Sequence, residues 1–255
     1  TANKEAKLVF RSEGSYPADN SIETEFNLLK VLNTTNLPVS EPIYLDTSCK
    51  ILHRPFMIMS YLDGSLGTSN EKVICDHELM ATQLRNIHQI EIDNLPELSL
   101  RVDPLDQLLS YIPKGRDWNE IRNFIKNLSI DEYKGKKCLL HGDYWPGNIL
   151  WNNENISGIL DWEYAAIGDP LADLAVTCLD ARYSNGEIGM NSFKQKYLGN
   201  EKIDEYRFNL WLIYIAASTL HYINNWNLDK QTKSIMKRES KLTILGSFNI
   251  IKNQS

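Results

Sequence analysis

One segment of the chain, residues 138–175, gathers the side chains best suited to do chemistry. A His-Gly-Asp triplet ends at Asp143, Asn148 follows five residues later, and Asp161 comes thirteen residues after the asparagine. Mg²⁺ takes one or two such carboxylate and amide oxygens and leaves its other positions to water and phosphate. The pattern therefore predicts Asp161 as a negative ligand and Asn148 as a neutral ligand of Mg²⁺. Asp143 would accept the proton of an attacking hydroxyl in a phosphoryl transfer.

These side chains are expected to converge at the open end of a β-hairpin. Apolar runs over residues 148–151 and 158–162 flank the sequence NNENIS, whose residues favour turns. If the hairpin is symmetric about residues 154 and 155, Asn148 lies directly opposite Asp161, and paired residues are about 4.5–5.5 Å apart at Cβ. Taken singly, Asp143, Asn148 and Asp161 are each more typical of a turn or capping residue. The spacing of the whole set favours the chemical interpretation.

The same segment resembles a family of small-molecule kinases. HGDYWPGN, followed by ILDWE and GDPLADLA, is similar to the aminoglycoside phosphotransferase and choline kinase-like family, whose members share the protein-kinase-like fold. The resemblance implies that Asp143 is the catalytic base. It also implies that Asn148 and Asp161 are metal ligands, Asp161 matching the aspartate of the protein-kinase Asp-Phe-Gly motif.

Three further residues are implied to support the catalytic loop. His141 is expected to pack and hydrogen-bond so that it holds the loop, while catalysis by His141 itself is the alternative. Asp173, in the helix after GDP, resembles the buried acid that supports the loop from beneath. Asp169 is the other candidate for that acid.

The N-terminal region agrees with this resemblance in outline. A helix expected over residues 20–33 carries Glu25 inside its apolar stripe and Glu23 outside it, so Glu25 points inward. It resembles the helix glutamate that pairs with a strand cation over the α- and β-phosphates. That cation would be Arg11, where many relatives carry lysine, and a planar guanidinium is not a point charge. A solvated surface pair of Arg11 and Glu25 is the alternative.

The expected fold class is α+β, a protein-kinase-like fold with two lobes. The backbone of Met59, Ser60 and Tyr61 resembles the hinge that meets the adenine. Residues 1–63 would form a partial, strand-rich nucleotide-binding lobe. Residues 64–255 would form a helical catalytic and substrate-binding lobe that includes the catalytic hairpin.

Periodicity and end signals predict the individual elements. Asn20 and Glu23 form a candidate capping box for the first helix. Strands are expected over residues 7–11, 42–45 and 56–61, and further helices over residues 77–88, 105–111, 118–128, 171–181, 191–197, 206–222 and 232–245.

Composition excludes several classes of protein. With 27 Lys and Arg against 33 Asp and Glu, the net charge is -6, so no basic field is available for a nucleic-acid backbone. The same charge favours a cationic over an anionic small molecule. The apolar run over residues 210–220 is too short to span a membrane, and the first residues do not form a secretory signal. Four scattered cysteines are typical of free thiols in a cytoplasmic protein.

The sequence therefore predicts a phosphotransferase that uses ATP or GTP with Mg²⁺ and acts on a hydroxyl of a small molecule, as a monomer or a weak homodimer. The acceptor stays open among aminoglycosides, macrolides, choline-like amines, homoserine, sugars and thiamine-like molecules, because a fold does not determine a substrate. A catalytically weak nucleotide-binding protein is the second hypothesis. A metal-dependent hydrolase that uses His141, Asp143 and Asp161 is the third.

The start of the chain gives one more expectation. Relatives place two strands and a phosphate-covering loop before the strand assigned to residues 7–11, and only the six residues TANKEA, without glycine, precede it. The natural product is therefore expected to be longer by some tens of residues.

Overall fold

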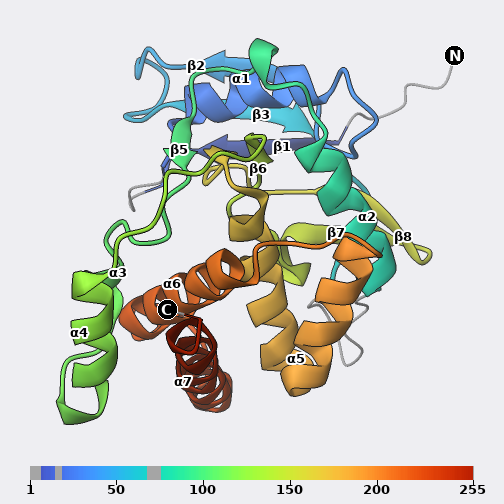
Figure 1. Cartoon of the computed structure of the whole chain (residues 1–255). Coiled ribbons are helices and arrows are strands. Elements are labelled where there is room, and N and C mark those ends of the chain that lie inside the picture. The colour runs from blue at the N-terminus through green and yellow to red at the C-terminus, as the bar shows by residue number, and fades with distance from the viewer. Residues whose placement is uncertain (1–6, 15–18, 68–75, 255) are drawn as a thin grey trace, which may run out of the picture. The chain divides into compact units, whose positions relative to one another are not determined.

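The computed structural model describes residues 7–14, 19–67 and 76–254, which belong to two compact units (Figure 1). The first unit comprises Thr1–Leu100 and Cys138–Ile167, and the second comprises Arg101–Lys137 and Gly168–Ser255. The sequence predicts a partial nucleotide-binding lobe over residues 1–63 and a catalytic and substrate-binding lobe over residues 64–255. That assignment stays a prediction. The expectations about residues 1–6 and the thiol of Cys75 lie outside the described residues.

The first unit contains the described strands and two α-helices. Their bounds are β1 Leu8–Ser12, α1 Ile22–Leu32, β2 Pro42–Asp46, β3 Phe56–Ser60, β4 Ser65–Leu66, α2 His77–His88, β5 Ser99–Arg101, β6 Cys138–Leu140, β7 Ile149–Asn152, β8 Asn155–Ile159 and β9 Ala166–Gly168, with 3₁₀ turns at Ile92–Asn94 and Pro146–Asn148. Arg101 and Gly168, the last residues of β5 and β9, already belong to the second unit. The mixed α+β class is thus confirmed.

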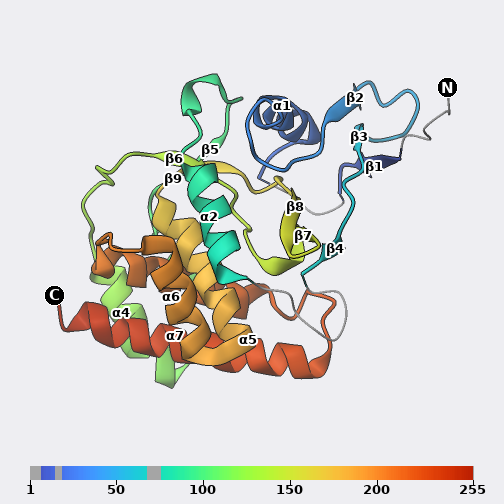
Figure 2. The ribbon, with the colours of Figure 1, turned by 90° about the vertical axis from the view of Figure 1, so that its right-hand side faces the viewer.

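Strands β1, β3 and β2 form an antiparallel sheet in that order, and α1 lies beside it (Figure 2). The apolar stripe of α1 is buried, as the sequence predicts. The predicted capping box is wrong, because Ser21 is the N-cap and its hydroxyl accepts a hydrogen bond from the amide of Thr24. Asn20 instead donates its side-chain amide to the carbonyls of Glu163 and Ala165. It therefore ties the start of α1 to the segment after β8.

Strands β4, β7 and β8 form a second antiparallel sheet, in which β7 and β8 are the predicted hairpin. Its turn residues Asn153 and Glu154 both have positive φ, as a tight two-residue turn requires. A bulge between Leu150 and Trp151 shifts the register. Asn148 consequently lies opposite Leu160, whose amide donates to the Asn148 carbonyl at 2.9 Å, and not opposite Asp161. The turn is centred one residue earlier than assumed, which alone would place Asn148 opposite Ile159, and the bulge moves the partner on to Leu160. The predicted register was therefore wrong by one residue.

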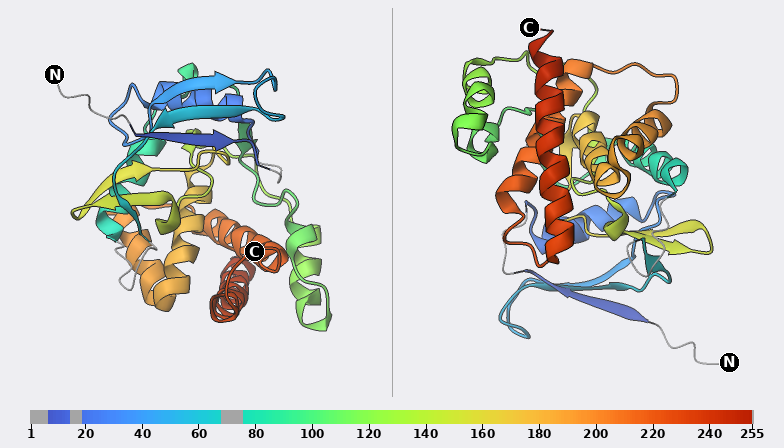
Figure 3. Two further views of the ribbon diagram at one scale, coloured as in Figure 1. Left: turned by 180° about the vertical axis from the view of Figure 1, so that it is seen from behind. Right: turned by 90° about the horizontal axis from the view of Figure 1, so that it is seen from below.

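The second unit is helical. Its helices are α3 Leu108–Tyr111, α4 Asn119–Asn127, α5 Pro170–Leu198, α6 Glu205–Tyr222 and α7 Lys230–Lys252, with a 3₁₀ turn at Arg116–Trp118. The two helices expected over residues 171–181 and 191–197 both lie within α5. The backbone of α5 is interrupted by non-helical φ and ψ angles at Asn185 and Gly186. Helix α7 runs alongside α6 (Figure 3).

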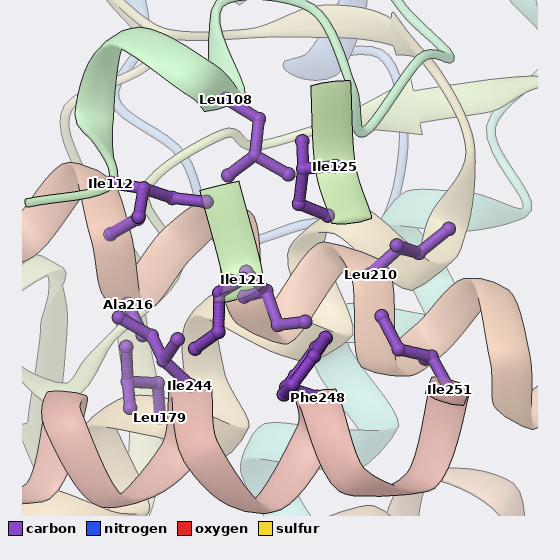
Figure 4. Packing of buried hydrophobic residues seen from close by; sticks show 12 residues of the cluster. Leu108, Ile112, Ile121, Ile125, Leu179, Leu210, Ala216, Ile244, Phe248 and Ile251 are labelled. Carbon is purple, nitrogen blue, oxygen red and sulfur yellow. The ribbon is translucent and has the colours of Figure 1, made fainter. Parts of the chain in front are cut away.

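A continuous apolar core fills the second unit. Its buried side chains come from α3, α4, α5, α6 and α7 and point toward one another (Figure 4). Asp169, Asp204 and Asp229 cap α5, α6 and α7 by accepting backbone hydrogen bonds in the first turn. Among the described residues, no helix is long and apolar enough to cross a membrane.

Candidate active site

His141 holds the loop that follows β6. Its side chain is fully buried, and its Nε2 lies 2.9 Å from the carbonyl oxygen of Leu160, which can only accept. Its Nδ1 accepts the backbone N–H of Asp143 at 3.3 Å. These two bonds define the neutral tautomer with the proton on Nε2. Because both ring nitrogens are engaged inside the protein, His141 orients the backbone of Asp143 and is not placed to act as a base.

Gly142 is the residue that lets this loop turn. Its φ is +84°, in the left-handed region, and a Cβ built there would lie 2.0 Å from the carbonyl oxygen of Tyr164. A side chain at this position would overlap backbone, which cannot move away as the end of a flexible side chain could. Glycine is therefore required between His141 and Asp143.

Asn148 holds the carboxyl of Asp143. Its Nδ2 donates to the backbone carbonyl of Asp143 at 2.9 Å and to Oδ2 of the same residue at 3.0 Å. Because both acceptors are oxygens, the orientation of the amide is determined, and the Asn148 Oδ1 is directed away from Asp143. The asparagine thus fixes the carboxylate with one end and presents a carbonyl oxygen with the other.

Burial raises the pKa of Asp143. The electrostatic interaction with His141 and the hydrogen bond from Asn148 oppose this effect, and the charge of Asp161 adds to it. A carboxylate with a raised pKa binds a proton more tightly than an exposed aspartate, which suits a group that accepts a proton.

Asp161 follows the hairpin in a strained conformation. Its φ is +65°, which an aspartate adopts at a cost, and its side chain is 33 % exposed. The next residue, Trp162, is buried and packs on the ring of His141 with 4.6 Å between centroids. The buried tryptophan anchors the backbone, so the Asp161 carboxylate is held at the surface while its neighbour points inward.

Arg11, on β1, joins Asp161 to helix α1. Its Nη2 lies 2.7 Å from Oδ1 of Asp161, and its Nε lies 3.3 Å from Oε2 of Glu25. The predicted inward direction of Glu25 and its pairing with Arg11 are therefore found in the structure. Burial of Arg11 lowers its pKa, but the charges of Glu25 and Asp161 outweigh this and raise it. Burial also raises the pKa of Glu25, to about 7, although Arg11 acts in the opposite direction.

Glu163 is a site residue that the sequence prediction omitted. Its Oε2 lies 2.8 Å from Nη2 of Arg11, the nitrogen that also contacts Asp161. Burial raises the pKa of Glu163, the charge of Asp161 raises it further, and Arg11 lowers it. Strand alternation gives no signal for it, because Asp161 has a φ of +65° and Glu163 lies in a turn. Its partner Arg11 lies far away in the sequence, so local pattern could not identify the contact.

The donor set fits a hard cation that brings most of its own ligands. Among residues 7–14, 19–67 and 76–254, no cluster of three or more His, Cys, Asp or Glu side chains could hold a metal ion by itself. Mg²⁺ does not require one, because it keeps several waters and binds one or two protein oxygens together with phosphate. The Asp161 carboxylate and the Asn148 Oδ1 are oxygens of the type it takes.

The expected hinge carries hydrogen bonds of its own. The amide of Ser60 donates to the carbonyl of Glu41 at 2.9 Å, and the amide of Tyr61 donates to the carbonyl of Lys7 at 3.2 Å. Both N–H groups are thus engaged by neighbouring strand segments. Met59 is paired within the sheet with Val9. Adenine contacts at Met59, Ser60 and Tyr61 stay a prediction.

Asp169 and Asp173 both lie in the second unit and are fully buried. Asp169 accepts hydrogen bonds from Arg207 Nε at 2.5 Å, from Trp211 Nε1 at 2.8 Å and from the Leu171 amide at 3.0 Å. It therefore caps α5 and ties it to α6. Asp173 lies in the first turn of α5, and its role in supporting the catalytic loop stays a prediction.

The chain belongs to the phosphotransferase enzyme family (APH), whose family model matches residues 1–208. Choline kinase LicA from Streptococcus pneumoniae has the same fold, with a TM-score of 0.61 and 15% identity over 96% of this chain and 88% of that one. An aminoglycoside phosphotransferase from Streptomyces rimosus, solved with ADP and streptomycin, has a TM-score of 0.57 and 15% identity, over 77% of this chain and 82% of that one. The protein-kinase-like fold is thereby confirmed.

The sequence is also similar to part of much longer proteins. Acyl-CoA dehydrogenase family member 10 of Mus musculus is 24% identical over 250 residues, which is 87% of this chain and 22% of the relative. The chain thus spans about a fifth of the length of that curated relative.

Proposed function

We propose that this protein is an ATP-dependent O-phosphotransferase that transfers the γ-phosphoryl group to a hydroxyl of a small molecule. The observation that carries the proposal is the pair formed by Asp143 and Asn148: a carboxylate with a raised pKa, held at 3.0 Å by an amide whose oxygen is directed elsewhere. The family, and the ADP bound in the Streptomyces relative, support the reaction class and the use of a nucleotide.

Asp143 acts as the base in this proposal. Its carboxylate accepts the proton of the acceptor hydroxyl as that oxygen attacks phosphorus, and burial supplies the affinity for the proton. His141 and Asn148 keep the carboxylate in one orientation, because each is bonded to a different part of Asp143. Little covalent chemistry is left to the protein, so positioning of this kind accounts for much of the rate.

Asn148 and Asp161 are the proposed Mg²⁺ ligands, and the ion supplies neutralisation of phosphate charge when bound. Asp161 contributes its exposed carboxylate, and Asn148 contributes Oδ1. Arg11, oriented by the buried Glu25, is the proposed cation for the nucleotide phosphates. Residues 1–63 would thus contribute nucleotide contacts, including adenine contacts at Met59–Tyr61, and residues 64–255 the catalytic groups and the acceptor.

The acceptor is proposed to be cationic, because the net charge of -6 attracts amines and repels carboxylates and phosphates. The test is a screen of hydroxylated cationic, neutral and anionic compounds for Mg²⁺- and acceptor-dependent consumption of ATP and GTP. Titration calorimetry with Mg–ATP accompanies it. Binding with turnover supports the proposal, and binding without turnover of any compound favours a catalytically weak nucleotide-binding protein. Absence of nucleotide binding contradicts both.

A further inference from the structure

Glu163 shares a single donor atom with Asp161. Nη2 of Arg11 lies 2.7 Å from Oδ1 of Asp161 and 2.8 Å from Oε2 of Glu163. A guanidinium Nη carries two hydrogens, so the two carboxylates use both of them. Because Nε faces Glu25 at 3.3 Å, the guanidinium is held on two sides at once.

This arrangement depends on the shape of arginine. A planar fork directs Nε to one side and Nη2 to another, whereas a lysine presents its three hydrogens from one point. Glu25 is buried within α1, while Asp161 and Glu163 are about one-third exposed. The guanidinium of Arg11 thus connects one buried acid with two partly exposed acids. Glu163 accepts the Nη2 hydrogen that is not used by Asp161.

The three carboxylates have different relations to the proposed chemistry. Glu25 lies behind Arg11, and Asp161 is the proposed metal ligand. The proposal takes Oδ1 of Asp161, the oxygen bonded to Arg11, as the one that turns to the cation. One Nη2 hydrogen is then released. The other remains on Glu163, and Glu25 and Glu163 together still fix the plane of the guanidinium.

We propose that Glu163 is a positioning residue for Arg11. It retains one Nη2 hydrogen and thereby directs the other, released from Asp161, at a nucleotide phosphate. This inference rests on the proposed nucleotide-dependent function and adds to it a residue that determines how tightly the nucleotide is held. Glu163 acts through Arg11 and does not itself touch the nucleotide.

Two substitutions separate this role from simple repulsion of the phosphates. Glu163→Ala removes the acceptor, whereas Glu163→Gln removes the charge and keeps an acceptor oxygen. We expect Glu163→Ala to weaken Mg–ATP binding and raise KM for ATP about tenfold, with kcat changed less than about threefold. Glu163→Gln should retain most of the affinity. Glu205→Ala, which removes an exposed acid that pairs with Lys194, is the control and should bind like the wild type.

Other outcomes would overturn the inference. Tighter binding in both Glu163 variants would indicate that Glu163 only repels phosphate. A changed Mg²⁺ dependence in both would indicate a metal ligand. In an Arg11→Lys background, Glu163→Ala should cost less than about threefold, because the fork is absent. A tenfold loss that persists there would show that Glu163 does not act through Arg11.

A measurement without nucleotide distinguishes failure of this inference from failure of the proposed function. Denaturant unfolding of the wild type, Arg11→Lys, Glu163→Ala and the double variant gives the coupling between the two residues. Absent coupling overturns the inference even if Mg–ATP binds. If the two residues are coupled but the wild type binds no nucleotide, the proposed function is contradicted. Glu163 then has no nucleotide-binding role, so the inference is overturned as well.

Discussion

The side-chain amide of Asn148 donates to the Oδ2 of Asp143 at 3.0 Å, so the two residues of the motif that stand five positions apart are bonded directly. A 3₁₀ turn over Pro146–Asn148 brings the asparagine back toward the aspartate. This contact commits the amide nitrogen and leaves the amide oxygen directed elsewhere. One asparagine therefore has two distinct roles to test.

Asp143→Asn should reduce phosphoryl transfer by about 10²–10⁴-fold while nucleotide affinity stays nearly unchanged, because the base acts on the acceptor hydroxyl. Single-turnover rates and calorimetric ATP titration check this. Turnover within threefold of the wild type would refute the assignment of Asp143 as the base.

Asp161→Ala should weaken binding of the metal–nucleotide pair strongly, because it removes the anionic ligand of the cation. Asn148→Ala should do so more mildly, since it removes a neutral ligand. Titration of Mg²⁺ against ATP affinity is the measurement. If the metal dependence of Asp161→Ala is unchanged, the ligand role is wrong.

Glu25→Gln should flatten the pH dependence of stability. The pKa of Glu25 is raised from 4.5 to about 7 by burial, so between these values the folded chain binds a proton that the unfolded chain does not. The free energy of unfolding therefore falls as pH rises through this window, by up to about 3 kcal/mol from this group. Denaturant unfolding at pH 5 to 8 measures it. Glu23→Gln, on the exposed side of the same helix, is the control and should keep the wild-type slope.

Gly142→Ala should destabilise the chain by several kcal/mol and abolish turnover, because its Cβ would overlap the carbonyl of Tyr164. Gly186→Ala is the control, because it tests the backbone strain without the overlap. Gly186 also has positive φ, +61°, with ψ -155°, but nothing lies within 4 Å of its Cβ position, so only the backbone strain of about 1–3 kcal/mol is expected. Equal thermal shifts in the two variants would show that the overlap is relieved by movement of the loop.

Asp169→Asn should lower the free energy of unfolding by about 3–5 kcal/mol, because it leaves the buried Arg207 without its counter-ion. The exposed pair of Lys252 and Glu120 provides the comparison, and Glu120→Gln should cost less than about 1 kcal/mol. Urea denaturation measures both. A cost below about 1 kcal/mol for Asp169→Asn would mean that the cap, and not the ion pair, is what holds α5.

Local features of the site could be predicted from sequence, and features that depend on register could not. The inward direction of Glu25 follows from its place in an apolar stripe, and it is confirmed. The predicted register of the hairpin was wrong, because the turn is centred one residue earlier than assumed and a bulge between Leu150 and Trp151 then shifts the later pairs by one residue. No residue type between Asn148 and Asp161 indicates either feature.

Glu163 and Asn20 were misjudged for a related reason. A glutamate beside a motif is usually solvated, and the ion pair of the partly exposed Glu163 depends on Arg11, which lies on the distant strand β1. Asn20 is a good capping residue by type, yet its amide is used across the fold by Glu163 and Ala165, while Ser21 caps the helix. In both cases a partner distant in sequence decided the outcome.

The division of the chain into two discontinuous units has a consequence for synthesis on the ribosome. The first unit needs residues 138–167 to complete the sheet in which Trp151 pairs with Ser65, and those residues emerge only after residues 101–137 of the second unit. The first hundred residues must therefore wait, with β4 unpaired by β7, while another part of the protein is made. No single cut in the gene yields either unit intact. A nonsense mutation between residues 100 and 143 leaves Arg11 and Glu25 without Asp143, Asn148 and Asp161.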